Sequence, residues 1–365
     1  MLRQLFEYHP VIGYRFIPDL KARVRHEGGG YLVRVNGSGF RCNHSFVAEK
    51  RRGIRRILLF GDSFTAGDGV SNDKRYGDLL EQKLPNVEVY NFGLPGTGTD
   101  QHYLAFQEYG IGIEHDLVII AILVENIRRV AARYRYYYNE NNEHVCYAKP
   151  YYELADERLI LRNVPPAREP VRELALSKDE RNAIDRVTGS PILRHLVFKI
   201  GRSPKLRRLV ITSGLKDRIQ KLIRYQPVRG YESPDNPAWR LMRRILEEWI
   251  RKDAGHVLLL PIPFYHYVMG ISEPHYQARL GEVVSSTGCS FHDPLPDLLK
   301  YPREQRRRLF FERDGHLTSE GHAALAASLQ PVLEKLLETP ATSIVSNGLR
   351  KNSQQGRSTP QEAYP

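Results

Sequence analysis

Apolar runs of strand length alternate along this chain with segments whose apolar residues recur at helical spacing. The apolar runs lie at 55–60, 87–91, 116–123 and 256–261, and the helical segments lie at about 75–84, 99–110, 237–254 and 273–287. An unbroken apolar run is typical of a strand that is covered on both faces, as in a parallel sheet. The alternation therefore predicts an α/β fold, in which Gly255 ends a helix before the last of these strands.

Two of the predicted helices carry an apolar stripe that indicates one buried face. The stripe in 237–254 contains Trp239, Met242, Ile245, Leu246 and Trp249. A second stripe, in a helix near the C-terminus, contains Leu325, Leu329, Val332, Leu333 and Leu336. We interpret both stripes as core packing, and we expect Thr318 to cap the second helix at its N-terminus.

The run at 55–60 leads directly into a turn that contains Gly61, Asp62 and Ser63. Open α/β sheets expose their reactive groups at the carboxyl ends of their strands, so the Ser63 hydroxyl would stand at such an end. Taken alone, these three residues are ordinary turn residues. We interpret Asp62 as a brace that binds backbone N–H groups of the turn.

Three further segments supply the other groups that a serine hydrolase requires. They are a strand and glycine-rich loop at 88–101, a buried strand that ends on Glu125 and Asn126 at 116–126, and a segment with Asp314 and His316 at 313–322. Bare backbone N–H groups in a glycine-rich loop can face a ligand oxygen.

Together with the Ser63 turn, these segments resemble the four sequence blocks of the SGNH (GDSL-type) hydrolase superfamily. The resemblance covers about 1–130 and 237–338, and it implies a flavodoxin-like three-layer α/β/α fold. We accordingly divide the chain into an N-terminal extension (1–53) that packs on the core, a hydrolase core (54–130 and 237–338), a basic and aromatic insertion (131–236) and a tail (339–365). The composition of the tail predicts disorder.

The resemblance also implies the roles of individual residues. Ser63 would be the nucleophile, His316 the base that removes its proton, and Asp314 the acid that orients the imidazole. The oxyanion hole would consist of the backbone N–H groups of Ser63 and Gly96 and the side-chain amide of Asn126.

The chain departs from the family pattern in the third and fourth blocks. In the third block either Glu125 or Asn126 fits the amide position, and we choose Asn126 because a carboxylate would repel the developing charge. In the fourth block Arg313 occupies the usual position of the acid. Asp314 is the nearest carboxylate, and Glu312 is the fallback.

Several residues beside these positions have structural interpretations. Gly93 and Gly98 are read as turn glycines, and Asp100 and Gln101 are expected to cap and orient the helix that follows the glycine loop. Cys42, Cys146 and Cys289 are too scattered for a disulfide framework or a metal site, so we expect free thiols and neither a metal nor a cofactor.

The charge of the chain is concentrated in one part of the insertion. The sequence has 54 Lys and Arg against 42 Asp and Glu, a net charge of +12, and 191–230 holds eleven of these cations against one acid. Apolar residues at helical spacing among them fit either an amphipathic helix on an anionic membrane or acidic partner, or an ordinary solvated helix. No nucleic-acid-binding motif accompanies the charge, so a nucleic acid partner is disfavoured.

The sequence therefore predicts a serine-dependent esterase that hydrolyses an O-acyl or O-acetyl ester of a small molecule or carbohydrate through an acyl-enzyme. Two alternatives stay open: an O-acyltransferase that modifies a polysaccharide or lipid, and a non-catalytic protein that binds through its basic insertion. The absence of a leader and of a long apolar run predicts a cytoplasmic location, peripheral to a membrane if the basic segment binds one.

Overall fold

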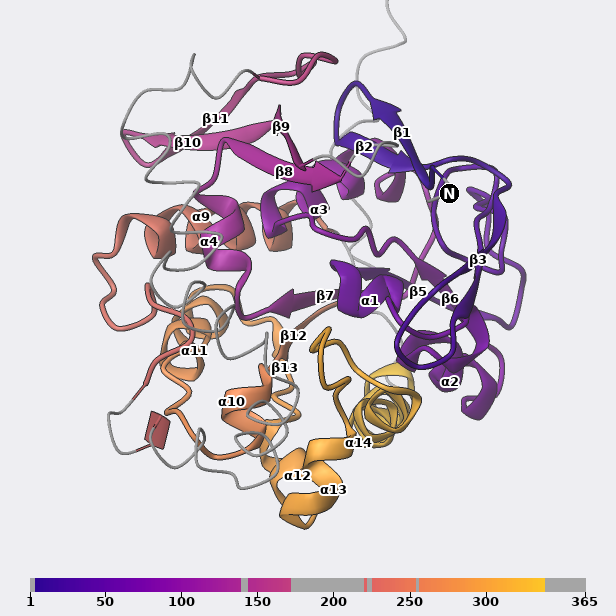
Figure 1. Ribbon diagram of the computed structural model, residues 1–365. Coiled ribbons are helices and arrows are strands. Elements are labelled where there is room, and N and C mark those ends of the chain that lie inside the picture. Colours follow the sequence, from indigo (N-terminus) through magenta and orange to yellow (C-terminus); the bar gives the residue numbers. More distant parts are fainter. Residues whose placement is uncertain (1–3, 139–143, 172–219, 222–224, 254–255, 339–365) are drawn as a thin grey trace, which may run out of the picture.

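The computed structural model describes residues 4–138, 144–171, 220–221, 225–253 and 256–338. At its centre lies a five-stranded sheet in the order β13-β12-β7-β5-β6, in which all neighbouring strands are parallel (Figure 1). The strands are β5 (Arg55–Phe60), β6 (Val87–Asn91), β7 (Leu117–Leu123), β12 (His256–Ile262) and β13 (Ser290–Phe291). The four expected strands are confirmed. The fifth, β13, was not predicted, because two residues are too few to show a pattern.

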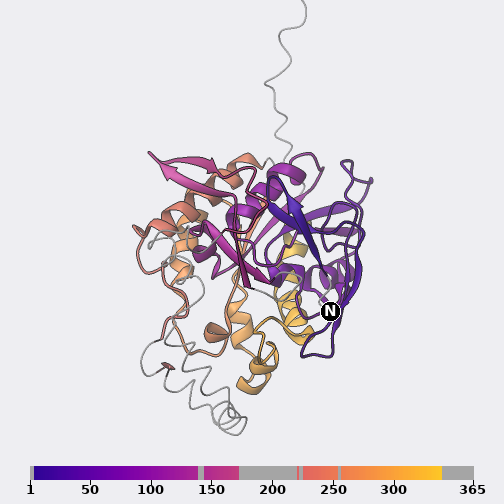
Figure 2. The same cartoon turned by 45° about the horizontal axis from the view of Figure 1, so that its top comes forward.

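Helices cover both faces of the sheet, which gives the expected three layers (Figures 1 and 2). One face carries α3 (Thr99–Ala105), α4 (Asn126–Val130), α9 (Pro237–Lys252) and α11 (Tyr276–Thr287), and the other carries α2 (Tyr76–Lys83) and α14 (Ser319–Glu338). Shorter helices are α1 (Ser63–Ala66), α10 (Tyr265–Val268), α12 (Leu295–Leu299) and α13 (Arg303–Arg308). A single-turn 3₁₀ segment (Asn72–Lys74) precedes α2, and a π-helical turn (Phe106–Gly110) extends α3.

The two predicted apolar stripes lie in the core. All five stripe residues of α9 have no exposed surface, and in α14 the side chains of Leu325, Leu329 and Leu333 are buried. Thr318 caps α14, because its Oγ1 accepts a hydrogen bond from the Gly321 N–H at 3.2 Å. α9 ends at Lys252, because Asp253 is already extended and its N–H donates to the Trp249 carbonyl oxygen, so the helix ends before Gly255, which itself lies outside the described residues.

The N-terminal extension consists of two antiparallel hairpins that share the core of the sheet. They are β1 (Phe6–His9) with β2 (Gly13–Phe16), and β3 (Lys21–Val24) with β4 (Tyr31–Arg34). Phe16 and Val33 belong to the same hydrophobic cluster as the sheet strands. The fully buried Arg41 guanidinium donates to the carbonyl oxygens of Gly67 at 2.8 Å and Val70 at 2.7 Å. The extension is therefore bonded directly to the chain that follows α1.

The described part of the insertion forms two further antiparallel hairpins, which the sequence did not predict. They are β8 (Tyr134–Tyr138) with β9 (His144–Ala148), and β10 (Tyr151–Ala155) with β11 (Arg158–Arg162). Most of the basic segment at 191–230, and the tail at 339–365, lie outside the described residues. Within the described ranges, no helix has both the length and the apolar character needed to cross a membrane.

Candidate active site

Ser63 lies at the first position of α1, directly after the carboxyl end of β5. The turn requires Gly61, because a Cβ at that position would lie 2.1 Å from Thr65 Oγ1. The Asp62 carboxylate accepts a hydrogen bond from the Phe64 N–H at 3.0 Å, which caps α1. The expectation that Asp62 braces the turn is thereby confirmed, and the buried strand places Ser63 in one fixed position.

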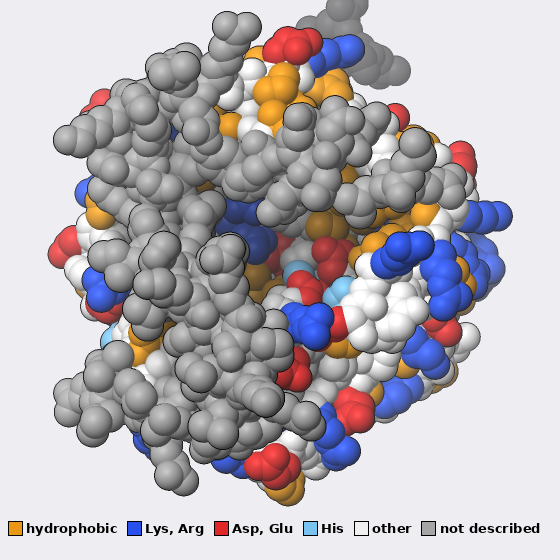
Figure 3. Space-filling model, in the orientation of Figure 1, with side chains coloured by type: hydrophobic (Ala, Val, Ile, Leu, Met, Phe, Trp, Pro, Cys, Tyr) orange, Lys and Arg blue, Asp and Glu red, His pale blue; other side chains and the backbone are white. Residues whose placement is uncertain are grey.

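His316 and Asp314 come from the loop before α14 and meet Ser63 in space. His316 Nε2 lies 2.8 Å from Ser63 Oγ, and His316 Nδ1 lies 2.8 Å from Asp314 Oδ2. The second pair is within ion-pair distance, although the Nδ1–H does not point along the line of a full hydrogen bond. Acidic and histidine side chains gather in a hollow of the surface near α1 (Figure 3). His316 thus lies within hydrogen-bond distance of the Ser63 hydroxyl on one side and within ion-pair distance of the Asp314 carboxylate on the other.

The electrostatic environment favours a charged His316. Burial by itself would lower the pKa of His316, but the contact with Asp314 and the negative charges of Asp68 and Asp314 raise it above the ordinary value of 6.5, with a smaller contribution from Asp62. Burial likewise opposes ionisation of Asp314, yet its contacts with His316 and His26 lower the pKa of that carboxyl to about 2. An ionised Asp314 therefore faces an imidazole that binds a proton more readily than usual.

Three polar groups at the carboxyl ends of the strands are candidates to bind an oxyanion. Asn126 has no exposed surface, and both polar atoms of its amide lack a hydrogen-bond partner among the described residues. Gly96 has a φ of +78°, a left-handed conformation that favours glycine. Neither the Ser63 N–H nor the Gly96 N–H donates to another described residue. A buried amide without a partner is costly, and a ligand oxygen would accept a hydrogen bond from its Nδ2–H group.

Comparison with known families agrees with this geometry. The family model for GDSL-like lipases and acylhydrolases matches residues 59–324, well over half of the chain. The chain belongs to the GDSL-like lipase/acylhydrolase family. It is accordingly a hydrolase, and its five-stranded parallel sheet with helices on both faces is the α/β fold of SGNH hydrolases.

Similar solved structures include lipolytic proteins and an esterase. A lipolytic protein of the G-D-S-L family from Veillonella parvula is 10% identical, covers 77% of this chain and 99% of its own, and has a TM-score of 0.41. The lipase/acylhydrolase from Enterococcus faecalis is 15% identical, with 77% and 96% covered and a TM-score of 0.39. An acetyl xylan esterase is 13% identical, with 76% and 99% covered and a TM-score of 0.40. No curated protein matches the chain.

The two candidates for the amide position of this GDSL-like hydrolase have different surroundings. The Glu125 carboxylate lies at the start of α4, 3.5 Å from Arg128 Nη1 and 3.3 Å from Arg129 Nη2. It is partly exposed, whereas Asn126 is fully buried. The Glu125 side chain is thus already paired with two arginines, whereas the Asn126 amide has no partner among the described residues.

In the fourth block, Asp314 is the acid that reaches His316. Glu312 is exposed, and within the described part of the chain it makes no contact with His316. The carboxylate that contacts His316 is therefore two residues before it in the sequence, and its role as the acid stays a prediction.

Arg129 is a site residue that the sequence analysis missed. Its Nη1 lies 2.6 Å from Asp62 Oδ2 and donates to the Thr97 carbonyl oxygen at 3.1 Å. Burial raises the pKa of Asp62, and the Arg129 charge opposes that shift. An arginine on a short helix normally faces solvent, so nothing in the sequence marked it as a buried partner. Arg129 ties the Ser63 turn to the glycine loop and to α4.

The remaining predicted positions have structural roles. The Gly93 N–H donates to Asn91 Oδ1 at 2.8 Å, and a Cβ on Gly93 would lie 2.3 Å from the Ala66 nitrogen. Gly98 has an extended backbone and precedes α3. Gln101 donates to the Ile12 carbonyl oxygen at 2.8 Å, which orients α3 against the N-terminal extension.

Asp100 differs in part from its expected capping role. It lies at the start of α3, as predicted, but its carboxylate also forms a buried ion pair with Lys149 of the insertion. Lys149 is far away in the sequence, and no local pattern connects the two residues.

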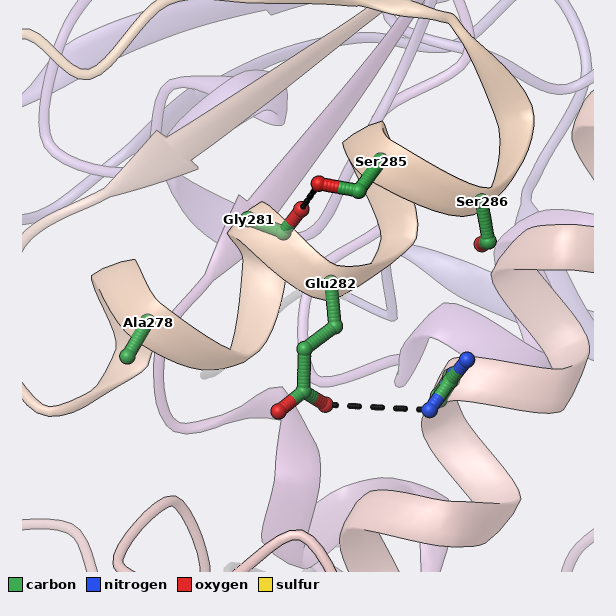
Figure 4. Close-up of a pocket in the computed structure, with 6 residues that line it drawn as sticks. Ala278, Gly281, Glu282, Ser285 and Ser286 are labelled. Carbon is green, nitrogen blue, oxygen red and sulfur yellow. Dashed lines mark hydrogen bonds and ion pairs between the residues drawn. The ribbon is translucent and has the colours of Figure 1, made fainter.

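An open groove between α9 and α11 is separate from this site (Figure 4). It is lined by Arg243, Ala278, Gly281, Glu282, Ser285 and Ser286. An ion pair of 3.8 Å between Arg243 and Glu282 crosses it. None of the candidate site residues lines this groove, so we assign it no part in the chemistry.

Proposed function

We propose that this GDSL-like hydrolase is a serine-dependent esterase that cleaves an O-acyl or O-acetyl ester through an acyl-enzyme. The observation that carries the proposal is the 2.8 Å contact between Ser63 Oγ and His316 Nε2. A serine hydroxyl is a weak nucleophile unless a neighbouring base removes its proton, and this contact supplies that base.

In the first half of the reaction Ser63 Oγ attacks the carbonyl carbon of the ester, and its proton passes to His316 Nε2. Asp314 stabilises the imidazolium that forms. The negative charge moves to the former carbonyl oxygen, where the N–H groups of Ser63 and Gly96 and the amide of Asn126 would receive it. The C–O bond to the alcohol then breaks, and His316 returns the proton to the leaving alkoxide.

In the second half water replaces the alcohol. His316 takes a proton from water as it attacks the acyl carbon, the bond to Ser63 Oγ breaks, and Oγ recovers the proton. The products are a carboxylic acid and the free enzyme. If a sugar or lipid hydroxyl took the place of water, the same residues would catalyse acyl transfer, and an assay that identifies the final acyl acceptor would distinguish the two reactions.

A fluorophosphonate probe tests the proposal without knowledge of the substrate. The probe phosphonylates a serine only if its hydroxyl is activated, so we expect an adduct on Ser63 that mass spectrometry locates. Ser63→Ala and His316→Ala should both abolish labelling. Ser285→Ala, on α11, is the matched serine control and should label normally. Folded wild-type protein that does not label, or labelling that survives His316→Ala, would contradict the proposal.

A further inference from the structure

The acid that faces His316 lies on a loop that the sheet does not support. We call residues 311–316 the acid loop. It is closed by two backbone hydrogen bonds, Phe311 N–H to the His316 carbonyl oxygen at 2.8 Å and Gly315 N–H to the Phe311 carbonyl oxygen at 3.0 Å. The Asp314 side chain is still 33% exposed. Neither backbone bond fixes the direction of that carboxylate, so some other group must hold it.

His26, in the N-terminal extension, contacts the same carboxylate oxygen as His316. Its Nε2 lies 2.8 Å from Asp314 Oδ2. The other ring nitrogen, Nδ1, accepts a hydrogen bond from the Gly28 N–H at 3.3 Å. An accepting Nδ1 places the proton of the neutral ring on Nε2. His26 is therefore oriented to donate to Asp314, and its side chain is only 13% exposed.

The residues next to His26 hold the backbone and the aromatic side chain of the acid loop. The Glu27 carboxylate accepts hydrogen bonds from the Asp314 N–H at 2.8 Å and the Arg313 N–H at 3.1 Å. The Phe311 ring packs edge-on against the His26 ring, with 4.4 Å between centroids. A Cβ on Gly28 would lie 2.8 Å from Phe311 Cε1, so a larger residue at this position would displace the Phe311 ring. Three kinds of contact thus join segment 26–28 to the acid loop.

We propose that His26 is a positioning residue, which holds the Asp314 carboxylate in place so that Oδ2 faces His316 Nδ1. This inference rests on the proposed function, in which Asp314 orients and stabilises the base. The His26 Nε2–H donates to Oδ2 and the His316 ring lies within ion-pair distance of the same oxygen, and together these contacts restrict rotation of a carboxylate that would otherwise turn toward solvent. The N-terminal extension then contributes a positioning residue to the active site.

The test compares two substitutions of His26. His26→Phe keeps a ring against Phe311 but removes the donor, whereas His26→Gln restores an N–H donor near the position of Nε2. We expect His26→Phe to slow fluorophosphonate labelling of Ser63 by up to about 100-fold, because a misplacement of about 1 Å can have an effect of this size. With p-nitrophenyl acetate as the ester, kcat should fall while KM stays constant, and His26→Gln should recover most of the lost rate.

His44 offers a matched control in the same extension. Its Nε2 lies 2.8 Å from Glu81, a histidine–carboxylate pair that contacts none of the site residues. His44→Phe should label at the wild-type rate. If His26→Phe labels as fast as wild type, or if His26→Gln is as slow as His26→Phe, the positioning role is wrong.

An NMR titration of the His316 imidazole separates this inference from the proposed function. The carboxylates that raise the pKa of His316 are Asp314, Asp68 and Asp62, and His322, which also interacts with His316, has a pKa lowered by burial to about 3. If Asp314 turns away in His26→Phe, the pKa of His316 should fall, because the imidazolium loses its nearest carboxylate. An unchanged or higher pKa in the variant would overturn the inference. This readout holds even if wild-type Ser63 fails to label, which would refute the esterase proposal alone.

Discussion

The nucleophile turn (61–67) and the acid loop hold Ser63 and Asp314, on opposite sides of His316, by different means. Ser63 is 5% exposed and is fixed by neighbours in the sequence, through a buried strand and the Asp62 cap. Asp314 is one-third exposed and is held by His26, 288 positions away. Changes near the nucleophile turn should therefore reduce stability, whereas changes at the acid loop should reduce rate.

The largest effect on stability is expected at Arg129, behind the nucleophile turn. Arg129→Met keeps much of the side-chain volume but leaves the buried Asp62 carboxylate without its counter-charge. Removal of one partner from a buried ion pair typically costs about 3–5 kcal/mol. We expect a loss of that size in the free energy of unfolding, measured by urea denaturation.

Arg133→Met is the matched control for that substitution. Arg133 lies 2.8 Å from Glu153, but its side chain is 52% exposed. Exposed ion pairs contribute about 0–1 kcal/mol, so this variant should unfold almost as the wild type does. If the two variants lose the same stability, the buried pair does not fix the nucleophile turn.

Asn126→Ala sharpens the comparison, because it is a change in the buried region that should affect rate and not stability. Loss of one oxyanion donor typically lowers kcat by about 100- to 1,000-fold. The amide has no partner among the described residues, so its removal leaves no new unsatisfied group in the protein. We expect kcat toward p-nitrophenyl acetate to fall by that factor, while the urea midpoint stays close to that of wild type.

Glu125→Gln is the control for the amide position. In the wild type the Glu125 carboxylate contacts Arg128 and Arg129 of α4. Because we assign it no contact with the oxyanion, we expect kcat of Glu125→Gln to stay within a few-fold of wild type. A large loss in Glu125→Gln with a small one in Asn126→Ala would show that Glu125 is the functional residue of the pair.

The same contrast explains which parts of the structure could be predicted from sequence. The strands β5, β6, β7 and β12 and the fully buried stripe of α9 follow from local apolar patterns, and the structure confirms them. Each of the three proposed oxyanion-hole residues lies within five residues of the end of a strand, so its position was also predictable from its neighbours. They are Ser63 after β5, Gly96 after β6 and Asn126 after β7.

The contacts that the sequence did not reveal join residues far apart in the chain. Arg129 meets Asp62 across 67 positions, and Lys149 meets Asp100 across 49. A buried arginine or lysine looks like a surface residue in the sequence, because its burial depends on a partner that no local pattern identifies. His26 was not predicted for the same reason.

The smallest expected effect is a shift in the pH dependence of labelling, which tests the acid loop directly. His316 must be neutral to accept the Ser63 proton, and its pKa is raised above 6.5. The rate of fluorophosphonate labelling should therefore rise with pH through a midpoint above 6.5. Asp314, with a pKa of about 2, stays ionised throughout this range. Asp314→Asn should move the midpoint to lower pH, because the imidazolium loses that negative charge, and Glu312→Gln should leave it in place. If the midpoint moved in Glu312→Gln and not in Asp314→Asn, Glu312 would be the acid. Asp314 and its contact with His26 could then not be compared with the nucleophile turn.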